Sequence, residues 1–189
     1  MVTSRALYLG FLGLLAAERL FELAVSRRNA ARAIARGGRE SGRAHFPLLV
    51  ALHSGFLASC ALESGVRPFP GALGWTALGI ALFAQGLRYW AVASLGDRWN
   101  VRVIVVPGDS PVERGPYRFV RHPNYAAVVL EMAAVPLIHG CWWTAAVFSA
   151  LHAVALRVRI RAEEAALGPA WKSAFSGRPR FLPGGGGRG

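Results

Sequence analysis

Charged residues, lysine and cysteine are all scarce in this sequence. Charged residues make up 17% of its 189 positions, against roughly 25% in an ordinary soluble domain. Lysine occurs only at Lys172 and acidic residues number 10, so the net charge of +12 comes almost wholly from arginine. Two cysteines, Cys60 and Cys141, are too few for a disulfide framework or a zinc site, and we expect inert packing residues. Strong basicity is also typical of nucleic-acid binding, but 53% of the residues are hydrophobic and apolar runs separate the basic clusters, which indicates a small membrane protein.

The apolar residues form five runs. We predict an all-α integral membrane protein with about five transmembrane helices, at residues 6–25, 45–62, 71–95, 123–138 and 141–156. The last two runs have only about 16 residues each and are joined by a tight turn at His139-Gly140, so we expect a hairpin that tilts or sits partly within the protein. Residues 1–183 then form one domain, and residues 184–189 a flexible glycine-rich tail.

A cleaved signal peptide is the alternative interpretation of the first apolar run, because residues 6–17 have the length of its apolar region. Glu18, Arg19 and Glu22, however, stand where a small-residue cleavage site is needed. The sequence therefore favours a retained helix.

Arginine and lysine are distributed unevenly between the connecting segments. Six arginines lie within residues 26–44, five within 96–122, and seven arginine or lysine residues follow residue 156, whereas Arg5 and Arg67 stand alone in the remaining segments. Cytoplasmic loops of membrane proteins are enriched in basic residues. Five spans with the N-terminus outside place all three basic segments in the cytoplasm, so we predict an outside N-terminus and a cytoplasmic C-terminus.

Several polar side chains lie inside the apolar runs, where each needs a partner within the protein. Glu18 and Glu22 share one helix face; pairing with arginines is the common role for such residues, and orienting a substrate or cofactor is the alternative. Glu131 needs a cationic or hydroxyl partner. His53 is more often a hydrogen-bonded packing residue than a ligand, and we keep it as a minor candidate. Outside these runs, residues 101–106 form a short β-branched stretch that we expect to be extended.

The segment 115–125 gathers cations, an imidazole, an amide and two phenols directly before the fourth run. Pro123 suits the first turn of a helix, so His122 would lie at a helix N-terminus, whose free N–H groups attract anions. The alternative is an ordinary helix start flanked by interfacial arginines and tyrosines. Beyond the fifth run, Arg159 and Glu163 share a helix face, as ordinary i, i+4 pairs at solvated helix ends also do. Because a hairpin returns the chain to its starting side, we expect these two polar sets to meet in a cytoplasmic pocket formed by the connector and the tail.

Three motifs follow one another along this part of the chain: Gly115-Pro-Tyr-Arg, Arg121-His-Pro-Asn-Tyr125 and, after the hairpin, Arg159-x-x-x-Glu163-Glu164. In this order they resemble the isoprenylcysteine carboxyl methyltransferase family of integral membrane methyltransferases, over about half of the chain. The earlier pattern Glu18-Arg-Leu-Phe-Glu-Leu, followed by Ser26-Arg-Arg-Asn, is similar to a bacterial branch that includes O-methyltransferases of alkylresorcinols and alkylpyrones. This similarity implies a bacterial inner (plasma) membrane protein. Phospholipid N-methyltransferases and membrane sterol reductases carry similar elements, so the motifs are less specific for the substrate.

The resemblance implies a binding site for S-adenosylmethionine and a substrate-binding arginine. The positions that match cofactor contacts are Tyr117, His122, Pro123, Asn124, Tyr125 and Glu163. The segment of Asp109, Ser110, Pro111 and Val112 falls where the family contacts the cofactor through its backbone, although its sequence departs from the eukaryotic pattern. Arg159 matches the arginine placed at the substrate.

Methyl transfer is an in-line displacement that needs a nucleophilic oxygen, alignment and exclusion of water. A carboxylate acceptor is already ionised, and Arg159 could hold it with a charge-assisted fork. A phenol, with a pKa of about 10, would instead need a cation to favour its anion or a base to take its proton. Glu131 and His53 are the candidate bases. We therefore expect an S-adenosylmethionine-dependent O-methyltransferase of a lipidic acceptor, surrounded by membrane lipid, with no metal and no required protein partner. The alternatives are an NADPH-dependent membrane reductase of the sterol-reductase kind, which usually needs more helices, and a non-enzymatic scaffold whose arginines set topology and bind anionic lipid.

Overall fold

The computed structural model describes residues 2–42 and 45–181, and helices dominate this part of the chain. Its five long helices are α1 (Val2–Ala35), α2 (His45–Glu63), α3 (Ala72–Leu95), α4 (Pro123–Leu137) and α5 (Trp142–Ala174). The segment between α3 and α4, here called the connector, contains two 3₁₀ turns, η1 (Gly96–Arg98) and η2 (Gly115–Arg118). The predicted glycine-rich tail at residues 184–189 lies outside the described residues.

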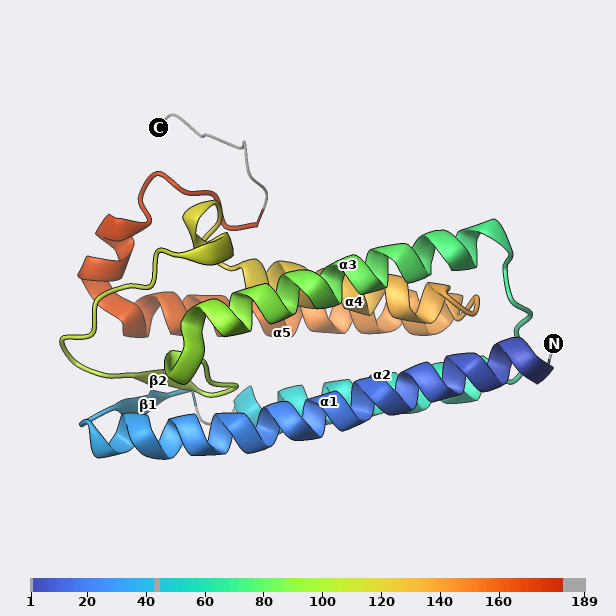
Figure 1. Ribbon diagram of the computed structural model, residues 1–189, viewed down its shortest axis with the longest axis horizontal. Coiled ribbons are helices and arrows are strands. Elements are labelled where there is room, and N and C mark those ends of the chain that lie inside the picture. Colours follow the sequence, from blue (N-terminus) through green and yellow to red (C-terminus); the bar gives the residue numbers. More distant parts are fainter. Residues whose placement is uncertain (1, 43–44, 182–189) are drawn as a thin grey trace.

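Helix α4 is the centre of the bundle, because it packs against both α3 and α5. Helix α2 packs against α5, and α1 lies beside α2 (Figure 1). The predicted hairpin of the last two helices is present, since the chain turns between Leu137 and Trp142 with Gly140 in the left-handed region at a φ of 68°. Helix α4 begins at Pro123, as the proline predicts. The hairpin thus brings the start of α4 and the second half of α5 to the same end of the bundle.

In the described part of the chain, three helices are long and apolar enough to cross a membrane: Phe46–Glu63, Ala72–Arg98 and Trp142–Ala174. The predicted class, a helical integral membrane protein, is confirmed at this level, whereas the five separate spans stay a prediction. Helix α4 has 15 residues and covers about 22 Å at the helical rise, less than the roughly 30 Å of a bilayer core. Helix α1 is longer than the predicted run 6–25, because it continues through the first arginines of the basic segment.

A small antiparallel sheet closes the end of the bundle where the connector lies. Strand β1 (Arg39–Ser41) pairs with β2 (Val103–Val105), with Arg39 opposite Val105 and Ser41 opposite Val103. The extended conformation predicted within 101–106 is therefore confirmed, and the sheet is the exception to the predicted all-α class. By this pairing the segment after α1 holds the connector against the bundle (Figure 1).

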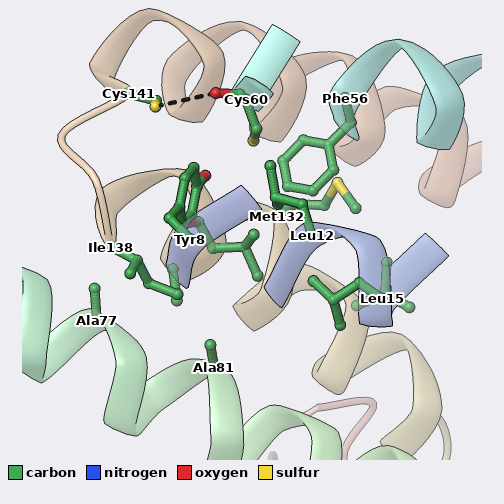
Figure 2. Packing of buried hydrophobic residues seen from close by; sticks show 13 residues of the cluster. Tyr8, Leu12, Leu15, Phe56, Cys60, Ala77, Ala81, Met132, Ile138 and Cys141 are labelled. Atoms are coloured by element: carbon green, nitrogen blue, oxygen red, sulfur yellow. Dashed lines mark hydrogen bonds between the residues drawn. The ribbon is translucent and has the colours of Figure 1, made fainter. Parts of the chain in front are cut away.

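The opposite end of the bundle contains the main hydrophobic core, which Figure 2 shows. The buried Tyr8 hydroxyl donates a hydrogen bond to the Val135 carbonyl oxygen at 3.1 Å, which ties α1 to α4. Cys60 and Cys141 are both free and fully buried, and the Cys141 Sγ lies 3.6 Å from the Cys60 carbonyl oxygen. Both cysteines are packing residues, as predicted. Neighbouring side chains from four helices complete this core, among them Leu12, Leu15, Phe56, Ala77, Ala81 and Met132.

A buried ion cluster joins three helices in the middle of the bundle. Arg88 of α3 pairs with Glu22 of α1 at 2.7 Å and with Glu131 of α4 at 3.4 Å. Arg19 contacts the same two carboxylates, at 2.9 Å and 3.2 Å. The sequence predicts a cationic or hydroxyl partner for Glu131, and the structure provides two cations, Arg88 and Arg19. Glu22 pairs with arginines, as expected. Because Arg88 and Glu131 are 6% and 5% exposed, each charge depends on the others for stability.

Replacing Arg88 by methionine should destabilise the protein strongly. The substitution leaves Glu22 with one cation fewer in a buried site, and breaking a buried pair in this way typically costs about 3–5 kcal/mol. Thermal unfolding of the purified protein in detergent measures the effect. Arg28→Met is the matched control, because Arg28 is a helical arginine of α1 that is exposed. Equal melting temperatures for the two variants would contradict the structural role of the cluster.

Candidate functional site

A cavity of about 500 Å³ begins at the connector and extends to the middle of the bundle. Its outer end is lined by residues 109–112, Trp171 and Phe175, and its deep end by Arg88, His53 and His152. Leucines and valines of α1, α2, α4 and α5 line the walls between the two ends. The volume lies within the roughly 300–1,000 Å³ of small-molecule sites. The cavity therefore has room for a ligand with both polar and apolar parts.

The start of α4 is held at the outer end by the last described residues of the chain. The amide of Arg121 donates to the Pro179 carbonyl oxygen at 2.9 Å, and the amide of His122 donates to the Arg180 carbonyl oxygen at 3.1 Å. The His122 Nε2 lies 3.1 Å from a Glu164 carboxylate oxygen, and Arg180 pairs with the same carboxylate at 2.7 Å. A carboxylate only accepts hydrogen bonds, so it fixes the Nε2–H form of His122. The tail thus orients the imidazole.

Arg159, Tyr125 and Glu163 form a chain of hydrogen bonds across the hairpin. The Arg159 Nε donates to the Tyr125 hydroxyl at 2.8 Å, and this hydroxyl donates to the Glu163 carboxylate. A second guanidinium nitrogen, Nη2, donates to the Val101 carbonyl oxygen of the connector. The two polar sets that the sequence predicts to meet are therefore in direct contact. Tyr125 is the residue that joins them.

Arg159 differs in its partners from Arg88, the other buried arginine among the described residues. It is 6% exposed, yet within residues 2–42 and 45–181 no carboxylate lies at ion-pair distance from it and no hydrogen bond involves its Nη1. Arg88, equally buried, contacts two carboxylates. A buried cation with neutral partners and free N–H groups in a cavity wall is a ready site for an anion.

Asn124 and Tyr117 also line the cavity. The Asn124 Oδ1 is buried, and no group in the described part of the chain donates to it. A buried acceptor without a donor is costly, which points to a ligand that donates a hydrogen bond there. Burial, and then the nearby charge of Glu163, raise the pKa of Tyr117. Tyr117 therefore stays a neutral phenol at physiological pH and can donate a hydrogen bond.

The segment 109–112 lines the cavity, as the prediction requires of a cofactor-binding segment. Asp109 lies 3.6 Å from Arg36, the residue that follows α1, and 3.7 Å from Arg98. Arg98 also donates to the Ser110 carbonyl oxygen at 2.5 Å. These contacts hold the segment over the cavity. Pro123 begins α4 but does not line the cavity, so a direct contact between Pro123 and a cofactor stays a prediction.

The structure does not bring Glu131 to the other predicted site residues. Both of its carboxylate oxygens face arginines of the buried ion cluster, and it is not part of the cavity lining. A catalytic role for Glu131 therefore stays a prediction. His53 does line the cavity; its Nδ1 bonds the Leu49 carbonyl oxygen at 2.9 Å, and its ring lies 4.9 Å from that of His152.

Sequence reasoning missed four residues of this region. Trp171 and Phe175 stack at 5.0 Å, and the Trp171 ring lies 5.5 Å from that of His122. They reach the cavity because α5 is kinked at Gly168, which has a φ of 74°. His152 precedes Arg159 by seven residues and so shares its helix face, a spacing that the sequence does contain. Glu164 belongs to the third sequence motif, but the sequence did not indicate its contact with His122.

The sequence profile of the Isoprenylcysteine carboxyl methyltransferase (ICMT) family matches residues 77–169. This match includes most of α3, the connector, α4 and most of α5. The chain is 40% identical over 159 residues to the protein YpbQ of Bacillus subtilis (strain 168), a match that covers 82% of this chain and 94% of that protein. It is 26% identical over 153 residues to a protein of Haemophilus influenzae (strain ATCC 51907 / DSM 11121 / KW20 / Rd), covering 80% and 89% of the two chains. Neither relative's name states an activity.

Gly115→Ala should loosen the segment before α4. Gly115 has a φ of 59°, and a methyl group there would collide with the Ser94 Oγ. Gly108→Ala is the matched control, because Gly108 also has a positive φ, 84°, but no atom lies within 4 Å of the added carbon. We expect Gly115→Ala to lower the melting temperature more and to speed hydrogen exchange at the amides of Arg121 and His122. Equal exchange in both variants would show that the close packing at Gly115 does not hold this segment.

Proposed function

We propose, because the chain belongs to the isoprenylcysteine carboxyl methyltransferase family, that it is a membrane O-methyltransferase that uses S-adenosylmethionine and acts on a lipidic acceptor. The single observation that carries the proposal is Arg159, a buried cation without a carboxylate partner among the described residues, in the wall of a cavity beside the start of α4. In this interpretation the outer end of the cavity holds the cofactor. The rest of the cavity holds the acceptor.

The outer end suits S-adenosylmethionine in its donor and acceptor groups. The unpaired Asn124 Oδ1 can accept a hydrogen bond from an amino group of the cofactor. Glu163 supplies a carboxylate for its positive charge, and the stacked rings of Trp171 and Phe175 supply an aromatic wall. His122 and Tyr117, both buried, complete the same region. When bound, the cofactor would supply an electrophilic methyl group on a sulfonium.

Arg159 would bind and orient the oxygen that receives the methyl group. Arg159 would hold this oxygen toward the methyl group that the cofactor would supply, and an anionic acceptor would become neutral on receiving it. Tyr125 and the Val101 carbonyl oxygen fix the guanidinium, so its orientation exists before the acceptor arrives. Such preorganised positioning is the main contribution that a protein makes to a displacement of this kind.

The identity of the acceptor oxygen decides whether a base is needed. A carboxylate needs none. A phenol must lose its proton, and the cavity offers His53 and His152, whereas both oxygens of Glu131 are already engaged by arginines. The apolar walls suit an alkyl or isoprenoid-like chain, as in alkylresorcinols, alkylpyrones or isoprenoid acids. With the predicted N-terminus on the outer side of the membrane, the end of the cavity at the connector would face the cytoplasm of a bacterial cell. S-adenosylmethionine is made there.

Calorimetric titration of the detergent-solubilised protein with S-adenosylmethionine tests the cofactor. We expect saturable binding with one site per chain, and a loss of at least about tenfold in affinity for His122→Ala, the effect of removing an oriented polar contact to a charged ligand. His139→Ala is the matched control, because His139 lies at the opposite end of the bundle, in the turn before α5. It should bind like the wild type.

The same titration with NADPH separates the alternatives. Binding of NADPH in place of S-adenosylmethionine would support a reductase of the sterol-reductase kind. If the folded protein binds neither, the proposed cofactor is wrong, and a non-enzymatic membrane scaffold becomes the better interpretation.

Arg159→Met should abolish methyl transfer while leaving cofactor affinity largely intact. Loss of one preorganised donor at a reacting centre typically lowers kcat by about 100-fold or more. Arg157→Met is the matched control, since Arg157 lies two residues earlier on the same helix and is exposed. Rates of methyl incorporation into an accepted lipid measure the effect. If both variants turned over like the wild type, Arg159 would have no role in catalysis.

A further inference from the structure

We propose that the chain carries a second binding site, for the phosphate group of an anionic phospholipid, at the end of the bundle opposite the connector. A separate cavity of about 320 Å³ lies there, between the first turns of α1, the link from α2 to α3, and the turn from α4 to α5. Figure 1 shows these three segments together at the end where the N-terminus lies. The proposal does not depend on methyl transfer.

His139 is the observation that points to a ligand. Its side chain lines this cavity and is 2% exposed, yet neither ring nitrogen has a hydrogen-bond partner in residues 2–42 and 45–181. Tyr8 stacks on the ring with the centroids 5.3 Å apart, so the imidazole is held in place by packing alone. Leaving buried polar atoms unpaired is costly. A ligand in the cavity would remove that cost.

Two arginines lie beside this histidine. Arg5 and Arg67 are the two basic residues that the arginine count assigns to the outer side of the membrane, and the fold brings them to the same cavity. The Arg5 guanidinium lies against Gly65, where an added Cβ would be 3.0 Å from its Nη2. No carboxylate of the described residues lies at ion-pair distance from Arg5. It is therefore free to bind an anion.

Arg67 is only partly neutralised. Its Nε is buried without a hydrogen bond, and the Glu63 carboxylate lies 3.4 Å away. That carboxylate also caps the first turn of α5: it accepts hydrogen bonds from the Thr144 amide and hydroxyl, both at 2.8 Å, and from the Trp143 amide at 3.2 Å. Of the two cations, only Arg67 has a carboxylate at ion-pair distance, and that carboxylate already accepts three hydrogen bonds from the start of α5. The cavity keeps a net positive charge.

Phosphate is the anion that fits these groups best. Its several acceptor oxygens can take two guanidinium groups and an imidazole N–H together. Burial, together with the charge of Arg5, lowers the pKa of His139, so at neutral pH the imidazole is neutral and donates one N–H. The cavity also has apolar walls from Ala6, Leu9 and Phe69. These walls favour a lipid headgroup over free phosphate.

Native mass spectrometry of the full chain in detergent tests the site, with dioleoyl phosphatidylglycerol and dioleoyl phosphatidylcholine as probes. We expect one tightly retained phosphatidylglycerol per chain and weaker retention of phosphatidylcholine. Arg5→Gln should weaken phosphatidylglycerol binding by roughly tenfold, the loss expected for one hydrogen bond between charged groups. Arg5 is exposed, so the variant should fold. Arg28→Gln, at the other end of α1, is the matched control and should bind normally.

His139→Phe separates recognition from packing, because it keeps a ring beside Tyr8 and removes both nitrogens. This variant should weaken phosphatidylglycerol binding as Arg5→Gln does, without a matching fall in melting temperature. Inorganic phosphate, titrated as a competitor, distinguishes a site for a lipid headgroup from a site for free phosphate. Displacement of the lipid at low phosphate concentrations would support a phosphate site that free anions also fill. Equal binding of the two lipids, or equal loss in Arg5→Gln and Arg28→Gln, would overturn the proposal.

Discussion

The structure depends on one constraint: a charge buried in the apolar part of the bundle needs a partner supplied by another part of the protein. Arg88, Arg19, Glu22 and Glu131 satisfy one another in the middle of the bundle, and their contacts join α1 and α3 to α4. Because α4 is also the first helix of the terminal hairpin, this cluster fixes the helix that begins directly after His122 and carries Tyr125 in its first turn. The site at the outer end of the cavity therefore rests on charges that lie outside it.

Arg159 breaks the pattern, and this exception supports the functional interpretation. It is as buried as Arg88, but its described partners are a phenol and a backbone carbonyl oxygen. Selection for stability alone favours a paired or absent charge at such a place. Arg159 has no carboxylate partner among the described residues, and it lies where the start of α4, the connector and the cavity meet. It is therefore suited to bind an anionic ligand reversibly. Family membership indicates methyl transfer as the chemistry, and the apolar cavity walls favour a lipidic acceptor.

The sequence predicted the elements that follow from local rules. Pro123 marked the start of α4, the short runs around His139-Gly140 marked the hairpin, and the hairpin implied that Arg159 and Glu163 return to Tyr125. It predicted that Glu131 needs a cationic or hydroxyl partner, but Arg88 and Arg19 could not be identified as that partner, because the pairing depends on how separate helices pack. The contact of residues 121 and 122 with the chain near Arg180 was missed for the same reason, since neither segment has a regular pattern of its own. Trp171 reaches the cavity only because α5 is kinked at Gly168. The direction of this kink cannot be predicted from the periodicity of the sequence.

Transfer of a labelled methyl group from S-adenosylmethionine to lipid tests the central claim most directly. Membranes of cells that produce the chain, supplied with the labelled cofactor and a lipid extract of a bacterium that carries a relative, should form an organic-soluble labelled product. Membranes that contain the Arg159→Met variant at equal abundance should not form it. If wild-type membranes bind the cofactor but leave all label in the aqueous phase with every lipid fraction offered, the chain is not a methyltransferase of lipids.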